Sequence, residues 1–252
     1  MVAATGVYLL LQQAVQAAQT PEKSKIYWFF SSEKNIFLAN VWGPHMAQYN
    51  HIAGQSVERL AALSDGVFAV AMTLLVLDLH TPAAVAIHSE RDLLHALAPL
   101  APRLLVYMMS FLTLGIFWVG QQTQLNQFER TDRDLSWLHL AFLFVVSLMP
   151  FSTALMAEFI HYRAALLLYW ANILLLGLGL LASWRLAVRH GLAGPNAGAH
   201  SYAIERRIIT AQALYAFGAL LCVVGTGWSL GFIVLVQLNY ALAPGVLRRL
   251  LP

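Results

Sequence analysis

The sequence contains a series of apolar stretches, each long enough to cross a lipid bilayer as a helix. They lie at about residues 57–79, 100–120, 136–157, 164–184 and 208–243. A bilayer core requires roughly 20 mainly apolar residues in helical form, so the last stretch is too long for one crossing. Its centre carries Gly225-Thr226-Gly227, which predicts a tight turn between two helices. The sequence therefore predicts an all-α polytopic membrane protein with six transmembrane helices.

The composition supports this class. Of the 252 residues, 59% are hydrophobic and 11% are charged, and the mean hydropathy is +0.64. Soluble domains carry about 25% charged residues, so lipid must cover much of this chain. Lys and Arg fall at the ends of apolar runs rather than in one patch, which argues against nucleic-acid binding. Cys222 is the single cysteine, which excludes an intrachain disulfide and a cysteine-based zinc site.

The positions of the arginines predict the orientation in the membrane, because Lys and Arg concentrate in cytoplasmic loops. One side of the predicted bundle carries most of them: Arg59, Arg130, Arg133, Arg185, Arg189, Arg206, Arg207, Arg248 and Arg249. The other side has Arg91, Arg103 and Arg163. Both termini are therefore expected in the cytoplasm, with the protein in a cell membrane.

The first 50 residues differ from the rest and are expected to form an N-terminal arm before a six-helix domain at 51–252. Their apolar stretch, GVYLLLQQAVQAAQ, is too short to span and lacks a basic segment before it, so it is a poor signal peptide. GPHM at 43–46 resembles the short sequence that a protease site and a cloning junction leave behind. Either Met46 is the natural start or the arm is native and amphipathic.

The first apolar stretch is unusual because it carries polar groups. Ser64 and Asp65 lie near its start, Thr73 in its middle and Asp78 near its end. Ionisable groups inside membrane spans are costly and usually face protein or water. Ser and Asp also favour helix starts, but a cap here would leave the helical pattern of the preceding VERLAAL unexplained.

One face of this predicted helix is a stripe with the spacing i, i+3, i+4 and i+7. Its members are Val70, Thr73, Leu74 and Leu77. Most apolar stripes of this kind are ordinary packing faces between helices. Periodicity alone therefore leaves packing and a pore lining as alternatives.

Three segments together resemble the transmembrane protein 175 family, the potassium channels of bacteria and endolysosomes. The first is RLAALSDGVFAVAMTLLVLDL at 59–79, which is similar to the family's Arg-x-x-x-Phe-Ser-Asp signature. The second is YMMSFLTLGIFW at 107–118, and the third is WLHLAFLFVVSLMPFSTAL at 137–155. The resemblance covers about residues 57–245 and is closest to the bacterial members, which have a single six-helix unit.

This resemblance implies a homotetramer whose first helices line a central pore, without a carbonyl selectivity filter. Val70 matches the position of the family's narrow apolar ring, Thr73 supplies a hydroxyl ring, and Leu74 and Leu77 continue the stripe. Potassium is then the permeant ion, and neither a bound metal nor a cofactor is expected. The bacterial inner membrane is the expected location.

The resemblance also implies that the polar motif has a structural role. Arg59, Ser64 and Asp65 are expected to join a hydrogen-bond network behind the pore, with Trp118 and His139 as candidate partners. Alternatively, Asp65 attracts cations at the inner mouth of the pore.

The sequence departs from the family at several positions. Leu63 replaces the signature Phe, Gln121-Gln122 replace frequent histidines, and His139 replaces a frequent Asn. Val70 is smaller than the usual Ile or Leu, which predicts a wider and less selective neck.

The other polar residues give weaker signals. Asp78 is either a cation-attracting ring at the outer mouth or a solvated carboxylate at a helix end. Glu158 and His161 have the i, i+3 spacing of metal ligands but lack a third ligand in the sequence. The chain offers no nucleophile–base pair, which argues against an enzyme.

Three functions remain open from the sequence. The first is a potassium-permeable channel. The second is a non-conducting membrane scaffold that uses the same helix face for packing. The third is a proton-coupled carrier or proton-leak pathway, for which Asp65 and His139 would form the relay.

Overall fold

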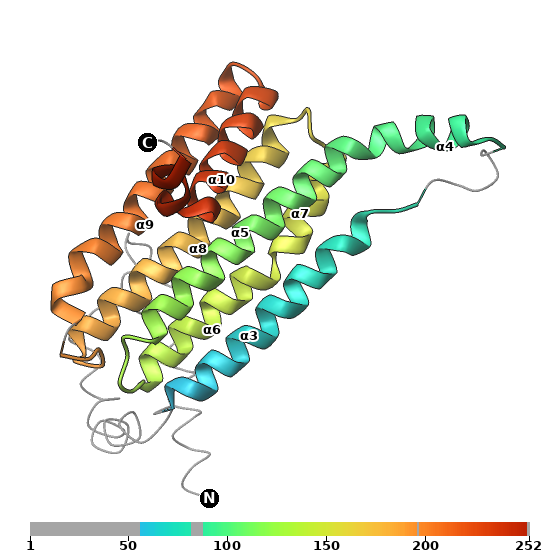
Figure 1. The fold of residues 1–252 in the computed structure, drawn as a ribbon. Helices are drawn as coiled ribbons and strands as arrows, with labels where there is room; N and C mark the ends of the chain where they lie inside the picture. The colour runs from blue at the N-terminus through green and yellow to red at the C-terminus, as the bar shows by residue number, and fades with distance from the viewer. Residues whose placement is uncertain (1–55, 82–87, 196, 251–252) are drawn as a thin grey trace, which may run out of the picture. The chain divides into compact units, whose positions relative to one another are not determined.

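The computed structural model describes residues 56–81, 88–195 and 197–250, without the side chains of 197–199 and 242–250 (Figure 1). The predictions about the N-terminal arm lie outside these residues. The described residues form α3 (Val57–Leu74), η1 (Leu75–Asp78), α4 (Glu90–Leu97), η3 (Ala98–Leu100), α5 (Ala101–Leu125), α6 (Arg133–Ser147), α7 (Met149–Glu158), α8 (Arg163–Arg189), α9 (Ala197–Leu220), η4 (Leu221–Val223) and α10 (Thr226–Leu250). The prediction of an all-α polytopic membrane protein is confirmed.

Five helical segments of the described residues are long and apolar enough to cross a membrane. They are Val57–Asp78, Glu90–Leu125, Arg133–Glu158, Arg163–Arg189 and His200–Val223. The predicted break in the last apolar stretch is also present, because η4 ends at Val223 and α10 begins at Thr226. The 25-residue α10 then runs back along α9.

Two boundaries differ from the sequence expectation. The second span begins ten residues earlier than predicted, because Ser89 caps α4 by accepting a hydrogen bond from the Asp92 amide. Figure 1 shows α4 continuing away from the bundle, and none of its residues is buried. The third span is two helices rather than one: α6 ends before Leu148, and Pro150 lies in the first turn of α7, where its missing N–H is tolerated.

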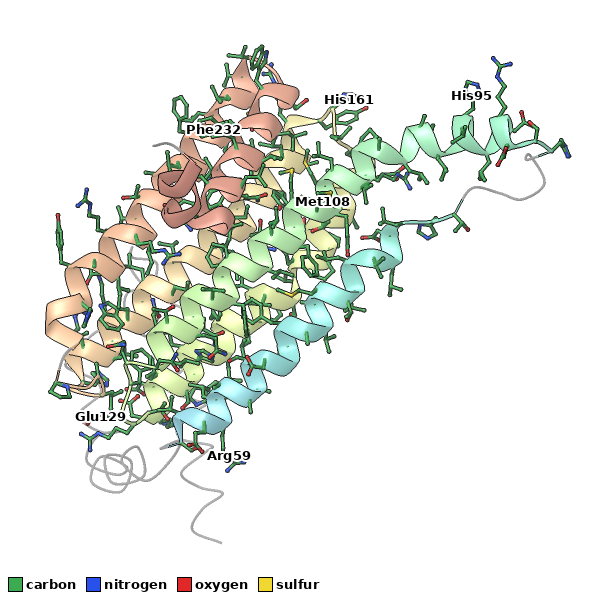
Figure 2. All side chains as sticks on the ribbon, viewed as in Figure 1. Arg59, His95, Met108, Glu129, His161 and Phe232 are labelled. Atoms are coloured by element: carbon green, nitrogen blue, oxygen red, sulfur yellow. The ribbon has the colours of Figure 1, made fainter. Side chains whose placement is uncertain are left out.

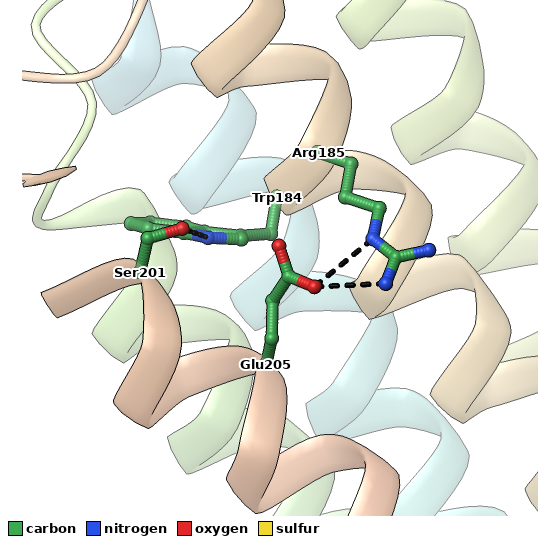
Figure 3. Close-up of polar contacts among 4 residues, drawn as sticks. All are labelled: Trp184, Arg185, Ser201 and Glu205. Carbon is green, nitrogen blue, oxygen red and sulfur yellow. Dashed lines mark hydrogen bonds and ion pairs between the residues drawn. The ribbon is translucent and has the colours of Figure 1, made fainter.

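The bundle is organised around α8, which packs against α5, α6, α7 and α9. Figure 1 draws α3 at one side of α5 and α6, and α9 with α10 at the other side. Two polar contacts fasten α9 to α8 (Figure 3): Trp184 Nε1 donates to Ser201 Oγ at 2.9 Å, and Arg185 donates to Glu205 Oε2 at 2.8 Å. These contacts fix which face of α9 is turned toward α8.

Small residues allow close helix contacts, as is common between membrane helices. Gly218 of α9 is an example, because a Cβ there would lie 2.9 Å from Ile233 and 3.1 Å from Phe232 of α10. We expect Gly218→Ala to lower the free energy of unfolding by about 1 kcal/mol, since overpacking outweighs the gain in helix propensity. Thermal unfolding in detergent measures this change.

Gly231→Ala is the matched control for this prediction. Gly231 lies on α10, and a Cβ there would meet nothing within 4 Å. The control should leave stability unchanged or raise it. Equal stabilisation by both substitutions would contradict a tight α9–α10 contact at Gly218.

Candidate functional site

The helix α3 has two faces of different character. The buried face turns toward α5, α6 and α7 and consists of Leu60, Ser64, Phe68 and Ala71, followed by Leu75 of η1. The opposite face carries Val70, Thr73 and Leu74 of the predicted stripe, which Leu77 of η1 continues, and all four side chains are exposed. Val70 is 57% exposed and Leu77 is 66% exposed. The described residues of one subunit therefore leave the stripe uncovered.

A shallow groove of about 480 Å³ runs beside this stripe. It is lined by Ala62, Leu63, Gly66, Val67, Val70, Ala71, Leu74 and Ser147. Leu63, which replaces the Phe of the family signature, is 46% exposed here. The hydroxyl of Thr73 donates to its own helix, at 3.0 Å from the Ala69 carbonyl and 2.9 Å from that of Val70. Its oxygen stays on the exposed face and can still accept a hydrogen bond.

Ser64 is the centre of a buried hydrogen-bond cluster between three helices. Its hydroxyl lies 2.7 Å from the Leu60 carbonyl and 2.7 Å from His139 Nε2 of α6. Gln121 Nε2 of α5 donates to Ser64 Oγ at 2.7 Å and also lies 2.7 Å from His139 Nε2. Ser64 is completely buried, and Gln121 and His139 are 1% and 3% exposed. These contacts tie α3 to both helices behind it.

Asp65 makes a second set of contacts beside the first. Its Oδ1 accepts from Trp118 Nε1 and from Gln122 Nε2, both at 2.7 Å and both from α5. Hydrogen bonds to a charged group are stronger than neutral ones. The structure thus brings together four of the five residues predicted for the network: Ser64, Asp65, Trp118 and His139.

Arg59 is the predicted residue that the structure does not bring to this network. Its backbone N–H donates to Ser56 Oγ at 3.3 Å in the N-cap. Among the described residues, its side chain makes no hydrogen bond or ion pair, and Figure 2 shows it at the N-terminal end of α3. It is an exposed residue in the first turn of α3, more than one helical turn before Ser64.

Gln121 and Gln122 take part in these contacts, although the sequence did not predict them there. The sequence suggested only that a titratable pair was absent there, whereas these two amides complete both sets of contacts. The available signal was spacing, because Trp118, Gln121 and Gln122 are at i, i+3 and i+4 and so share one face of a helix.

Other polar candidates are accounted for by structural contacts. Glu158 forms an ion pair with Arg103 at 2.5 Å. One of the two residues with metal-ligand spacing, Glu158 and His161, is therefore already paired. Asp132 caps α6 through the Leu135 amide and also lies 2.5 Å from His190 Nδ1. This contact fastens the start of α6 to the end of α8. Asp78 is half-buried at the end of η1.

This part of the chain is similar to known proteins. The family described as "Endosomal/lysosomal potassium channel TMEM175" matches residues 59–150, which include α3, α5, α6 and both sets of contacts. A potassium channel of Streptomyces collinus is 42% identical over 103 residues, which are 41% of this chain and 48% of that protein. The match thus spans about half of that relative's length.

Two further matches extend over most of the helices. A potassium channel of Chamaesiphon minutus is 29% identical over 189 residues, covering 73% of this chain and 93% of that protein. The crystal structure of a lysosomal potassium-selective channel TMEM175 homologue from Chamaesiphon minutus superposes with a TM-score of 0.63 at 27% identity, covering 74% of this chain and 96% of that one. The motif, the contacts behind it and these likenesses all point to the TMEM175 family, whose model matches residues 59–150 of this chain.

Proposed function

We propose that this chain is the subunit of a homotetrameric, potassium-permeable channel in the bacterial inner membrane. In this proposal residues 51–252 are the six-helix channel domain, residues 1–50 form an arm, and both termini lie in the cytoplasm. No cofactor is required, and potassium is the permeant ion.

The observation that carries the proposal is the asymmetry of α3. Polar contacts to α5 and α6 hold one face, while the opposite face exposes an apolar stripe with a single hydroxyl. A fourfold axis beside that stripe would place four copies of Val70, Thr73, Leu74 and Leu77 around one bore. Cyclic symmetry generates such a ring from one surface of one subunit.

The chemistry of the stripe suits conduction through an apolar neck. Hydrophobic constrictions gate by excluding water, and conduction requires weak binding of the ion. Potassium sheds its hydration water more readily than sodium, so a tight apolar ring favours potassium. Since Val70 is smaller than the Ile or Leu of related channels, we expect a wider neck and weaker discrimination than theirs.

The relatives favour a channel over the other two functions considered. Those named above are potassium channels, and the family is one of ion channels rather than enzymes. A proton-coupled carrier would need Asp65 to change partners during transport. Here its carboxylate already accepts two hydrogen bonds from α5, which suits a structural role.

Flux measurements in liposomes test the proposal. We expect the purified protein to conduct potassium faster than sodium, and Val70→Asn to raise the flux several-fold and lower the potassium-to-sodium ratio. The reason is that a polar ring keeps the neck hydrated. Val224→Asn is the matched control, because Val224 is 76% exposed at the α9–α10 turn and lies off α3.

Two results would contradict the proposal. One is the absence of any cation flux from folded, tetrameric Val70→Asn protein. The other is an identical change in selectivity for Val70→Asn and Val224→Asn, because the neck would then not be formed by α3.

A further inference from the structure

A cavity of about 260 Å³ lies away from α3, between the second half of α5 and residues 200–215 of α9. Its α5 wall includes Ile116, Phe117 and Gln124, and Leu180 of α8 forms part of its floor. The α9 wall is a stripe of residues at helical spacing: His200, Ala203, Ile204, Arg207, Ile208, Ala211, Gln212 and Tyr215. Tyr240 of α10 completes the lining. Most of the lining is apolar, as expected for a site that holds part of a lipid or small molecule.

Buried polar atoms without a hydrogen-bond partner belong to residues that line this cavity. Gln124 is 2% exposed and its Nε2 has no hydrogen-bond partner. Tyr215 is 1% exposed and its hydroxyl has no partner either. Unsatisfied polar groups buried in a membrane protein cost several kcal/mol each. Gln212 Oε1 is a third such atom in the lining. The donors of Gln124 and Tyr215 suit a bound molecule that carries hydrogen-bond acceptors.

The charge of the lining is positive. Arg207 lies ten residues into α9, within the segment His200–Val223 that is long and apolar enough to span a membrane. Its guanidinium lies over the Tyr240 ring, 6.0 Å from the centroid. The lining contains no Asp or Glu. Charged side chains within membrane spans usually pair with an opposite charge, so this cavity offers a place for an anion.

Other polar residues of α9 face away from this cavity. Ser201 and Glu205 face α8, where they bond Trp184 and Arg185 (Figure 3). Arg206 lines a different pocket with Ser201 and Glu205. The two adjacent arginines therefore lie on different faces of one helix, and only Arg207 belongs to the cavity.

We infer that this cavity binds an anionic phospholipid of the surrounding bilayer. The phosphate is held by the Arg207 guanidinium, and one acyl chain lies along the apolar walls. Phosphate and ester oxygens are acceptors, which matches the unpaired donor of Gln124 and the hydroxyl of Tyr215. Arginine suits this role because its planar donors match phosphate geometry. The bound lipid would brace α9 against α5.

A melting-temperature assay in detergent tests the inference, with dioleoyl phosphatidylglycerol, dioleoyl phosphatidylcholine or inorganic phosphate added to the full chain. We expect phosphatidylglycerol to raise the melting temperature by about 5 °C, because a ligand that binds the folded state stabilises it. Phosphatidylcholine and inorganic phosphate should raise it by less than half as much.

Two substitutions in the cavity should remove this response. Arg207→Gln should abolish the phosphatidylglycerol shift, and its matched control, Arg206→Gln, should retain it. Ala211→Trp fills the cavity by size and should abolish the shift while the protein stays folded. Native mass spectrometry should show phosphatidylglycerol retained by the wild type and by Arg206→Gln, and lost from the other two.

Four outcomes would overturn the inference. Equal melting-temperature shifts for Arg206→Gln and Arg207→Gln would mean that the lipid responds to general surface charge and not to Arg207. An equal shift with phosphatidylcholine would mean that the anionic phosphate is not recognised, and an equal shift with inorganic phosphate would mean a free-anion site. The absence of any shift and of any retained lipid in the wild type would mean that the cavity holds only water.

Discussion

Cadmium should abolish potassium flux through a Val70→Cys variant. If four first helices surround one axis at Val70, the substitution brings four thiols together around the bore. Soft divalent metals bind clustered thiolates tightly, so one cadmium ion would close the pore. In the liposome assay, we expect micromolar cadmium to reduce flux to that of protein-free liposomes, and a dithiol chelator to restore it.

The background for this experiment is simple because the chain has one native cysteine. Cys222 is buried at 5% exposure, and Cys222→Ser removes it. The control is Val224→Cys in the same background, which places an exposed thiol at the α9–α10 turn, where Val224 is 76% exposed against 57% for Val70. Cadmium should leave that variant unaffected. Block of both variants, or of neither while both conduct, would place the pore elsewhere than the exposed face of α3.

Substitution of Ser64 by Val should lower the free energy of unfolding by about 2–3 kcal/mol. Val lacks the hydroxyl and is one carbon larger than Ser, so the change removes the hydrogen bonds and also crowds a fully buried site. The hydroxyl contacts Leu60, His139 and Gln121, all within 2.7 Å, in a site with no exposure. Buried polar groups that lose a partner cost about 1–3 kcal/mol. The melting temperature should fall by roughly 5–10 °C.

Ser136→Val controls for the loss of an ordinary helix contact. Ser136 Oγ lies 2.7 Å from the Asp132 carbonyl at the start of its own helix, as Ser64 Oγ does from Leu60, but among the described residues it has no hydrogen-bond partner on another helix. We expect its effect to stay below about 1 kcal/mol. If Ser64→Val were no more harmful than Ser136→Val, the cluster would not be what holds α3 to α5 and α6.

The same variant separates the role of the polar motif from that of the pore stripe. Ser64→Val should reduce stability and assembly together, whereas Val70→Asn should change conduction in protein that folds normally. This division follows from their positions on opposite faces of α3. It would fail if Ser64→Val protein, once folded, showed a change in selectivity as large as that of Val70→Asn.

Hydropathy and local chemistry alone determined much of this protein. The apolar runs set the spans, because an apolar segment of that length must be helical in lipid to satisfy its backbone. Gly225 of the predicted Gly225-Thr226-Gly227 turn lies in the break before α10, whereas Thr226 and Gly227 begin that helix. The i, i+3, i+4, i+7 spacing set which residues share the exposed face of α3 and η1. These features depend on residues close together in the chain, so the sequence carries them directly.

Contacts between distant residues were decided by the tertiary structure. In the sequence, Gln121 and Gln122 stand where related proteins often have histidines. In the structure their amides donate hydrogen bonds to Ser64 and Asp65, which lie 57 residues earlier in each case. Arg59 shares a motif with these residues but lies in the first turn of α3, more than one helical turn before Ser64. The cavity beside Arg207 is likewise lined by residues of α5, α8, α9 and α10, which are far apart in the sequence. Which polar groups become partners depends on how helices pack, and packing is a property of the whole bundle.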